Sequence, residues 1–212
     1  MHELLDRVIS LFLPQRCVFC DKLVEYDDYW CEKCGKPGEP PFTRQGNIGP
    51  NAFAGAEYSG NIRNAVFKLK DRGDKRAAKF FAHEIYCAIN ITFDVIIPVP
   101  MARSKFDQLG YNQAQLLGDA LGRMTGVPIR ADALIRHEDT LVQHGLSAAQ
   151  RETNAARSYD IGNAQGLQGK TILLVDDVYT TGSTARACTK KLLEAGAGAV
   201  YTAAAASQAK RL

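Results

Sequence analysis

The stretch TILLVDDVYTTGSTARA, residues 171–187, decides the fold class of this chain. It opens with five consecutive apolar or β-branched residues, a pattern typical of a buried strand, and Asp176 and Asp177 follow directly. Small hydroxyl residues and a glycine come next and lead into a helical pattern. In an open parallel sheet, ligands bind beyond the carboxyl ends of the strands. We therefore expect a binding site at this junction of strand and helix.

The hydroxyl-rich turn has the chemistry of a phosphate site. A helix beginning near Ser183 presents free backbone N–H groups, and the residues around it are small: Thr180, Thr181, Gly182, Ser183 and Thr184. The carboxylates of Asp176 and Asp177 would repel phosphate, but they can accept hydrogen bonds from hydroxyl groups or hold a divalent cation. Together the two parts indicate a phosphorylated sugar. The alternative, a capped helix beside a solvated acidic turn, explains the whole run poorly.

The rest of the chain alternates helical and strand patterns. Apolar periodicity predicts helices over residues 61–70, 75–90, 112–126 and 183–196. Continuous apolar runs predict strands at residues 94–100, 170–175 and 199–206, with a further extended run at 128–136. This alternation favours an α/β fold with a mostly parallel sheet covered on both faces. We expect an N-terminal helix and metal knuckle over residues 1–45, a Gly- and Pro-rich linker over 46–56 and the main domain over 57–212.

Four of the six cysteines form two C-x-x-C pairs that are typical of a structural zinc site: Cys17, Cys20, Cys31 and Cys34. Four thiolates close the coordination shell, so such a site holds no catalytic water. Disulfides or a redox dithiol are the alternative, but no βαβ context surrounds these pairs. Cys87 and Cys188 lie in apolar helical patterns, and we interpret both as core residues. His83-Glu84 lacks the second histidine of a zinc-protease helix and is interpreted as helix surface.

Composition and charge set only broad limits on function. The chain has 212 residues, 46% of them hydrophobic and 23% charged, which is ordinary for a globular protein. Its formal charge of +3 permits contact with nucleic acid or phosphate but argues for neither. No stretch approaches the length of a membrane span, and the acidic residues near the N-terminus do not suit a signal peptide. We therefore expect a cytoplasmic protein.

The motif ILLVDDVYTTGST resembles the phosphoribosyl-pyrophosphate (PRPP) signature of type I phosphoribosyltransferases. The resemblance implies a Rossmann-like α/β fold. It also implies that Asp176 and Asp177 bind the ribose hydroxyls, that residues 180–184 bind the 5-phosphate, and that Mg²⁺ binds together with PRPP. Over nearly its full length the chain is similar to the ComF (ComFC, GntX-like) proteins associated with DNA uptake, which join a four-cysteine zinc knuckle to such a domain. The matching pieces are CVFC…CEKC, YSGNIRNAVFKLKDRGD, IIPVP, GYNQA, RHEDTLVQHGLSAAQRETN and the PRPP loop.

Two positions depart from the family pattern. Leu109 stands before GYNQ, where the family usually has an arginine, and Lys70 precedes Asp71 rather than an aromatic residue. Lys70 stays a candidate for the pyrophosphate region, and Arg103 and Lys105 after IIPVP are candidates to take over from the missing guanidinium. A basic surface turn is the alternative for this pair. The polar segment with Arg136, Thr140, Gln143, Arg151 and Asn154 fits a flap that covers the site during transfer, or else an ordinary surface loop.

Two functions of different classes remain open at this stage. The first is an enzyme that transfers phosphoribosyl from PRPP to an unidentified acceptor. The second is a non-catalytic competence protein that responds to PRPP and binds single-stranded DNA or the DNA-uptake machinery. Stacking aromatic residues would support the second, and the candidates are Tyr26, Tyr29 and Trp30, which we expect to pack against the knuckle instead. The acceptor and the oligomeric state stay open.

Overall fold

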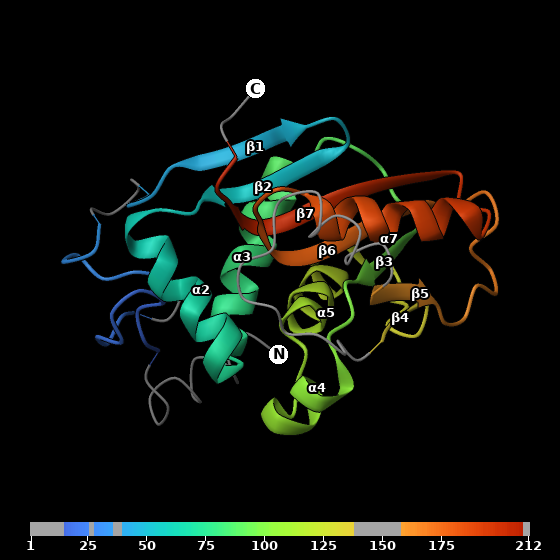
Figure 1. The fold of residues 1–212 in the computed structure, drawn as a ribbon. Helices are drawn as coiled ribbons and strands as arrows, with labels where there is room; N and C mark the ends of the chain where they lie inside the picture. The colour runs from blue at the N-terminus through green and yellow to red at the C-terminus, as the bar shows by residue number, and fades with distance from the viewer. Residues whose placement is uncertain (1–14, 26–27, 36–39, 138–157, 210–212) are drawn as a thin grey trace, which may run out of the picture.

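The structure is a computed structural model that describes residues 15–25, 28–35, 40–137 and 158–209. Figure 1 shows a five-stranded sheet in the order β1-β2-β7-β6-β3. Its strands are β1 (Arg44–Gly49), β2 (Ala52–Glu57), β3 (Val95–Pro98), β6 (Thr171–Tyr179) and β7 (Ala199–Ser207). β1 is antiparallel to β2, whereas β2, β7, β6 and β3 are all parallel. The expected α/β class with a mostly parallel sheet is confirmed.

Strands β6 and β7 lie inside the sheet, and each contains a run of fully buried residues. Residues 172–175 of β6 are apolar and without solvent exposure, and β7 carries four alanines in a row, residues 203–206, that are equally buried. Alanine occupies little volume, so helices can approach this part of the sheet closely. β6 continues past the predicted end at Val175 and carries Asp176 and Asp177 within the strand.

Helices cover both faces of the sheet. Alternate side chains of β6 point to opposite faces, so Leu173 and Val175 pack in one core cluster while Ile172 and Leu174 pack in another. The first cluster includes apolar side chains of α2 (Gly60–Arg72), α3 (Lys75–Ala88) and α5 (Gln113–Thr125). The second includes Cys188 and Leu192 of α7 (Ser183–Glu194). Each of the four predicted helices is present.

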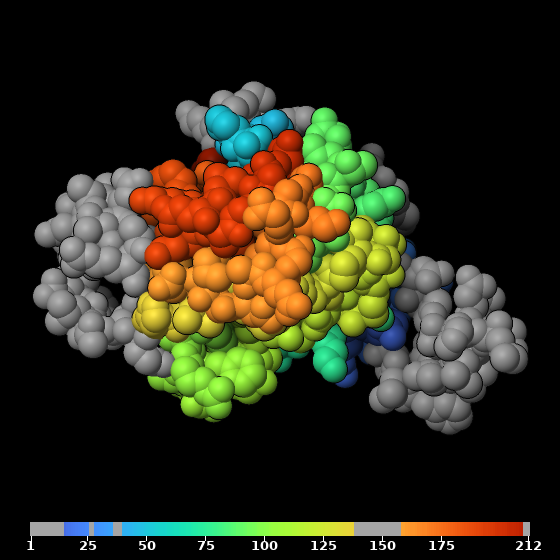
Figure 2. Space-filling view, turned by 90° about the vertical axis from the view of Figure 1, so that its right-hand side faces the viewer, coloured from blue at the N-terminus to red at the C-terminus, as the bar shows by residue number. Residues whose placement is uncertain are grey.

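Two smaller pieces follow the end of β3. Helix α4 (Arg103–Leu109) has no buried residue and projects from the body of the molecule at the bottom of Figure 1. Strands β4 (Leu134–Arg136) and β5 (Tyr159–Ile161) form a separate antiparallel pair. Figure 2 shows α7 (red-orange) above the orange segment that contains β5, with α4 (green) at the lower edge. In the part of the chain that the structure describes, no helix is both long and apolar enough to cross a membrane.

Several sequence predictions are wrong. The segment 46–56, expected as an irregular linker, belongs to the hairpin β1–β2 and joins the sheet beside β7. Cys87 is exposed rather than in the core, although Cys188 is fully buried as expected. Glu84 is not helix surface, because its buried carboxylate lies 2.7 Å from Nε of Arg44 on β1. The division of the chain into domains stays a prediction.

Candidate functional site

The turn between β6 and α7 presents the backbone N–H groups that a phosphate site needs. Gly182 precedes the helix in the left-handed conformation, with φ of 74°, and α7 begins at Ser183 without a side-chain cap. A β-carbon at position 182 would collide with the hydroxyl group of Tyr179, so only glycine fits there. Nη1 of Arg186 donates to the carbonyl of Thr181 at 2.8 Å and holds the turn from the helix side. The first turn of α7 therefore keeps its N–H groups available for an anion.

Asp177 is held by side chains from two distant helices. Its carboxyl oxygen Oδ2 lies 3.2 Å from Nζ of Lys70 on α2 and accepts a hydrogen bond of 3.0 Å from Nε2 of Gln113 on α5. The Asp177 side chain is buried, so these two donors supply much of what water would otherwise provide. The structure thus brings the predicted residue Lys70 to the segment 176–182, from the two aspartates to the start of α7, which we call the aspartate loop. Gln113, which sequence reasoning did not assign to the site, is brought there too.

Asp176 points toward the α7 side of the sheet, because side chains alternate along the strand. Its carboxyl oxygen Oδ1 accepts a hydrogen bond of 2.8 Å from the backbone N–H of Asp177. Burial, followed by the negative charge of Asp177, raises the pKa of the Asp176 carboxyl to about 8. At neutral pH the two acids therefore hold a proton between them, and a bound cation or a set of hydroxyl donors would favour its release.

The segment GYNQ braces the site from the start of α5. The hydroxyl of Tyr111 donates to the carbonyl of Lys70 at 2.9 Å, which ties α2 to this segment. Asn112 caps α5 by accepting from the N–H of Ala114 at 2.9 Å, and its Nδ2 donates to the carbonyl of Val99 at 2.9 Å. Asparagine before a helical pattern is a signal that sequence analysis can use for a cap. The bonds to Val99 and Lys70 are long-range and carry no local signal.

The basic candidates after β3 separate into two groups. Arg103 and Arg136 line one cavity of about 280 Å³ at the carboxyl end of β3, together with Phe106 and Asn112. Arg136 lies over the ring of Tyr159 at 5.5 Å. Lys105, in contrast, is exposed on α4 and lines none of the cavities found among the described residues. The flap candidates Thr140, Gln143, Arg151 and Asn154 lie outside the described residues.

The four cysteines of the knuckle converge on one point. The sulfur atoms of Cys17, Cys20, Cys31 and Cys34 all lie within 4.8 Å of one another. A tetrahedral zinc–thiolate site has Zn–S bonds of about 2.3 Å, which sets sulfur–sulfur distances of roughly 3.8 Å. The observed cluster matches this geometry after a small contraction. These residues could therefore hold a metal ion, and the four-thiolate set favours a structural role.

The knuckle is bound to the main core rather than attached by a tether. Lys68 of α2 is buried, and its Nζ donates to the carbonyl of Cys17 at 3.1 Å and lies 2.5 Å from Oδ1 of Asp21. Phe19 packs edge-on against Phe80 of α3 with ring centroids 5.6 Å apart. Lys68 and Lys70 stand on the same helix, so α2 contacts the knuckle and the aspartate loop at once.

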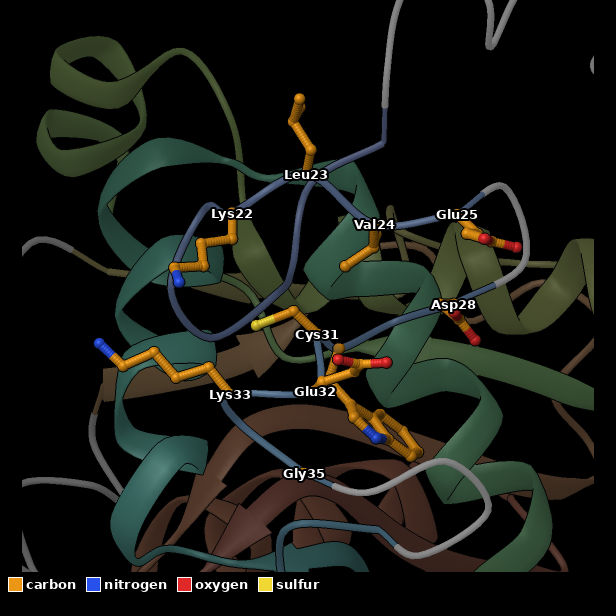
Figure 3. Close-up of a pocket in the computed structure, with 10 residues that line it drawn as sticks. Lys22, Leu23, Val24, Glu25, Asp28, Cys31, Glu32, Lys33 and Gly35 are labelled. Atoms are coloured by element: carbon orange, nitrogen blue, oxygen red, sulfur yellow. The ribbon is translucent and has the colours of Figure 1, made fainter.

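A cavity of about 600 Å³ lies over the knuckle (Figure 3). Lys22 and Lys33 extend to one side of it, while Glu25 and Asp28 lie on the other. Trp30 also lines it, but its ring packs against Phe42 at 6.0 Å. Because acids face the lysines across it and its tryptophan packs against Phe42, this cavity lacks the continuous basic groove with free aromatic faces that single-stranded nucleic acid needs.

Comparison with solved structures finds phosphoribosyltransferases among the similar chains. Glutamine phosphoribosylpyrophosphate amidotransferase from B. subtilis is 22% identical with a TM-score of 0.42, covering 67% of this chain and 27% of that chain. Adenine phosphoribosyltransferase from Leishmania tarentolae is 18% identical with a TM-score of 0.41, covering 74% of this chain and 77% of that chain. No family model matches the chain.

Sequence relatives are closer. DNA utilization protein YhgH of Escherichia coli is 27% identical over 205 residues, which covers 87% of this chain and 86% of the relative. Competence protein ComFC of Bacillus subtilis is 27% identical over 149 residues, covering 67% of this chain and 58% of the relative. Competence protein F of Haemophilus influenzae is 36% identical over 189 residues, covering 85% of this chain and 79% of the relative. On that similarity, the chain belongs to the competence protein F (ComF) family.

Proposed function

We propose that the chain binds PRPP with Mg²⁺ at the β6–α7 junction and transfers its phosphoribosyl group to an acceptor, in a process that serves DNA uptake or use. One observation carries the proposal. Asp176 and Asp177 lie in the last part of β6, which ends at Tyr179, and the glycine-capped helix α7 begins at Ser183 shortly after them. The setting comes from relatives whose names refer to competence and DNA utilization.

Each part of the site has a task in such a transfer. The carboxylates of Asp176 and Asp177 accept hydrogen bonds from the ribose hydroxyls, and the N–H groups at the start of α7 donate to the 5-phosphate. Arg103 and Arg136 line one cavity and Lys70 lies beside Asp177, so these cations suit the leaving pyrophosphate. The acceptor forms a bond to the ribose C1 while the C1–O bond breaks, its electron pair leaves with pyrophosphate, and the acceptor releases a proton to solvent.

Two metal ions belong to the proposal. Mg²⁺, when bound, neutralises charge on the pyrophosphate and ribose oxygens. For the knuckle we propose Zn²⁺, since four thiolates suit this ion better than the oxygen-seeking Mg²⁺ or Ca²⁺. Its task is to hold the N-terminal segment against α2 and α3.

The test begins with binding. Calorimetric titration with PRPP and Mg²⁺ should show binding to the wild-type protein, and the pair of changes Asp176→Ala and Asp177→Ala should abolish it. Asp119→Asn on α5 is the matched control, because it removes a carboxylate outside the loop. Binding that is unchanged in the double variant would refute the site.

Turnover is then measured as pyrophosphate release with a panel of bases, ribosides and oligonucleotides. Release that depends on one acceptor supports the transferase. Tight PRPP binding with no release across the panel would contradict it and favour the non-catalytic competence protein. The aromatic residues available for that second function are already in use, since Tyr29 packs on Phe80 at 5.5 Å and Trp30 on Phe42 at 6.0 Å. Tyr26 lies outside the described residues.

A further inference from the structure

A second polar cavity lies at the same edge of the sheet as the aspartate loop. It has a volume of about 470 Å³ and is lined by the carboxyl ends of β2 and β7, by β1 and by the first turn of α2. Ser207, at the end of β7, pairs with Glu57 of β2 on one side and with Tyr179 of β6 on the other. Neighbouring strands are roughly 5 Å apart, so this cavity begins about one strand away from the end of β6. The cavity with Arg103 and Arg136 lies at the end of β3, on the other side of β6.

Gln45 of β1, which lines this cavity, has a buried amide oxygen without a hydrogen-bond partner. Its side chain is 5% exposed, and its Nε2 donates to the carbonyl of Ala209 at 2.8 Å. This bond fixes the orientation of the amide, because the opposite orientation would set two oxygen atoms against each other. The other amide atom, Oε1, is buried and accepts no hydrogen bond from the protein. A buried oxygen without a donor is unfavourable, and a ligand N–H group that reaches it would supply the hydrogen bond.

Two charged side chains in the cavity have no ionic partner among the described residues. Glu57 is exposed at the end of β2, and among the described residues its carboxylate forms no ion pair. Arg63 lies over the ring of Tyr58 at 5.8 Å and likewise forms no ion pair with a described carboxylate. The neighbouring Arg44 differs, because its guanidinium is bound to Glu84. The cavity therefore offers acceptors on Gln45 and Glu57 and the guanidinium of Arg63 as a donor, beside the polar side chains of Thr43, Tyr58, Ser207 and Gln208.

We propose that this cavity is the acceptor pocket and that it takes a neutral molecule with N–H donors beside a carbonyl group. The N–H groups would meet Gln45 Oε1 and the Glu57 carboxylate, and the carbonyl would accept from Arg63. A phosphate or other anion fits poorly, since the Glu57 carboxylate faces the same cavity as Arg63, and Arg44 is already paired with Glu84. The volume suits a small planar molecule rather than a polymer. The claim that this ligand is the acceptor rests on the proposed transfer from PRPP. The claim that the cavity binds a ligand of this chemistry does not depend on that transfer.

Two sources share this chemistry, free nucleobases and simple carboxamides. Calorimetry or saturation-transfer NMR on the full chain would use adenine, guanine, cytosine and uracil in one arm, and nicotinamide and glutamine in the other, with and without PRPP and Mg²⁺. We expect one arm to bind. Glu57→Gln and Gln45→Met should each weaken that binding by about tenfold or more, the loss expected for a hydrogen bond to a buried or charged group. The affinity for PRPP should stay within about twofold, because neither residue lies at the β6–α7 junction.

The controls keep the two proposals separate. Arg63→Ala is compared with Arg123→Ala, an exposed arginine in the last turn of α5, and only the first should weaken the small ligand. Glu57 is exposed, so Glu57→Gln tests the pocket even if Gln45→Met does not fold. If PRPP binds and neither arm does, the pocket is refuted and the proposed function stands. If one arm binds through Glu57 while PRPP does not bind, the pocket stands and the transferase is refuted.

Discussion

At the scale of single residues, the carboxyl groups of Asp176 and Asp177 repel each other when both are ionised, and a bound cation or hydroxyl donor would reduce this repulsion. The two carboxyls are adjacent, and Asp177 has both Lys70 and Gln113 as partners. Asp176 bonds only to the neighbouring backbone among the contacts described above, and its side chain is half-buried. The protein therefore keeps a carboxyl group in a position that is good for binding and poor for stability.

Asp176→Asn should stabilise the unliganded protein, and more so at pH 8 than at pH 5. The pKa of Asp176 is raised to about 8 in the folded protein, above its ordinary value of 3.8. Between these values the folded chain holds a proton that the unfolded chain releases, so the free energy of unfolding falls as pH rises. Asparagine has no such proton. We expect a gain of about 1 kcal/mol or more at pH 8, on the scale of one pKa unit.

Urea denaturation at both pH values, without nucleotide or divalent cations, measures this gain. Asp119→Asn serves as the matched loss of one carboxylate on a helix. An equal gain at pH 5 and pH 8 would contradict the account of Asp176 given above.

At the scale of elements, the start of α5 holds three segments together. Tyr111, Asn112 and Gln113 reach α2, the residue after β3 and β6 respectively. One short turn thus positions Lys70 and Asp177 relative to each other.

Asn112→Ala should cost about 1–2 kcal/mol of stability, the upper range for loss of an N-cap. The change removes the cap on Ala114 and also leaves the carbonyl of Val99 without its donor. Gln115→Ala on the same helix is the control, since Gln115 forms no hydrogen bond with the described residues. Thermal or urea unfolding of both variants gives the comparison. If Asn112→Ala costs no more than Gln115→Ala, the bracing role is wrong.

The elements also show what the sequence could predict. Helices α2, α3, α5 and α7 follow from local apolar periodicity, and β6 from its continuous apolar run. The hairpin β1–β2 was missed because Gly46, Gly49 and Pro50 resemble a linker, while its strands are stabilised by pairing with β7 far along the chain. Met124 shows the same limit, since it lies at helical spacing from the buried Leu117 and Leu121 but its side chain is 45% exposed.

The candidate site divides in the same way. The aspartates and the glycine turn of the proposed site lie within one short motif, so the sequence alone could predict them as candidates. Gln113 and the cavity around Gln45 come together only when distant segments meet at the carboxyl edge of the sheet. No local pattern marks such residues.

At the scale of the whole molecule, the knuckle and the α/β domain share one hydrophobic core. Cys17, Val18 and Phe19 belong to the same cluster as Phe80 and Phe81 of α3. Arg76 extends this contact, because its Nε donates to the carbonyl of Arg16 at 2.8 Å. The metal site is therefore part of the folding unit.

Removal of the metal should lower the melting temperature of the entire protein in a single transition. Metal binding to a thiolate site contributes directly to folding free energy, and the shared core passes this loss to the main domain. Calorimetry before and after chelation measures the effect, with metal analysis of the starting protein to identify zinc. Cys31→Ser should act like chelation, whereas Cys87→Ser should not, because Cys87 is exposed and outside the cluster. A separate early transition that leaves the domain folded would contradict the shared core.

Helix α2 has a consequence for how this protein can vary in evolution. Lys68 faces the knuckle and Lys70 faces Asp177, and two residues along a helix turn it by roughly 200°. A residue inserted or deleted between them would rotate one lysine by about 100° away from its partner. The interval of two residues between these lysines is therefore fixed, and a lineage that inserts or deletes a residue there loses one of the two contacts.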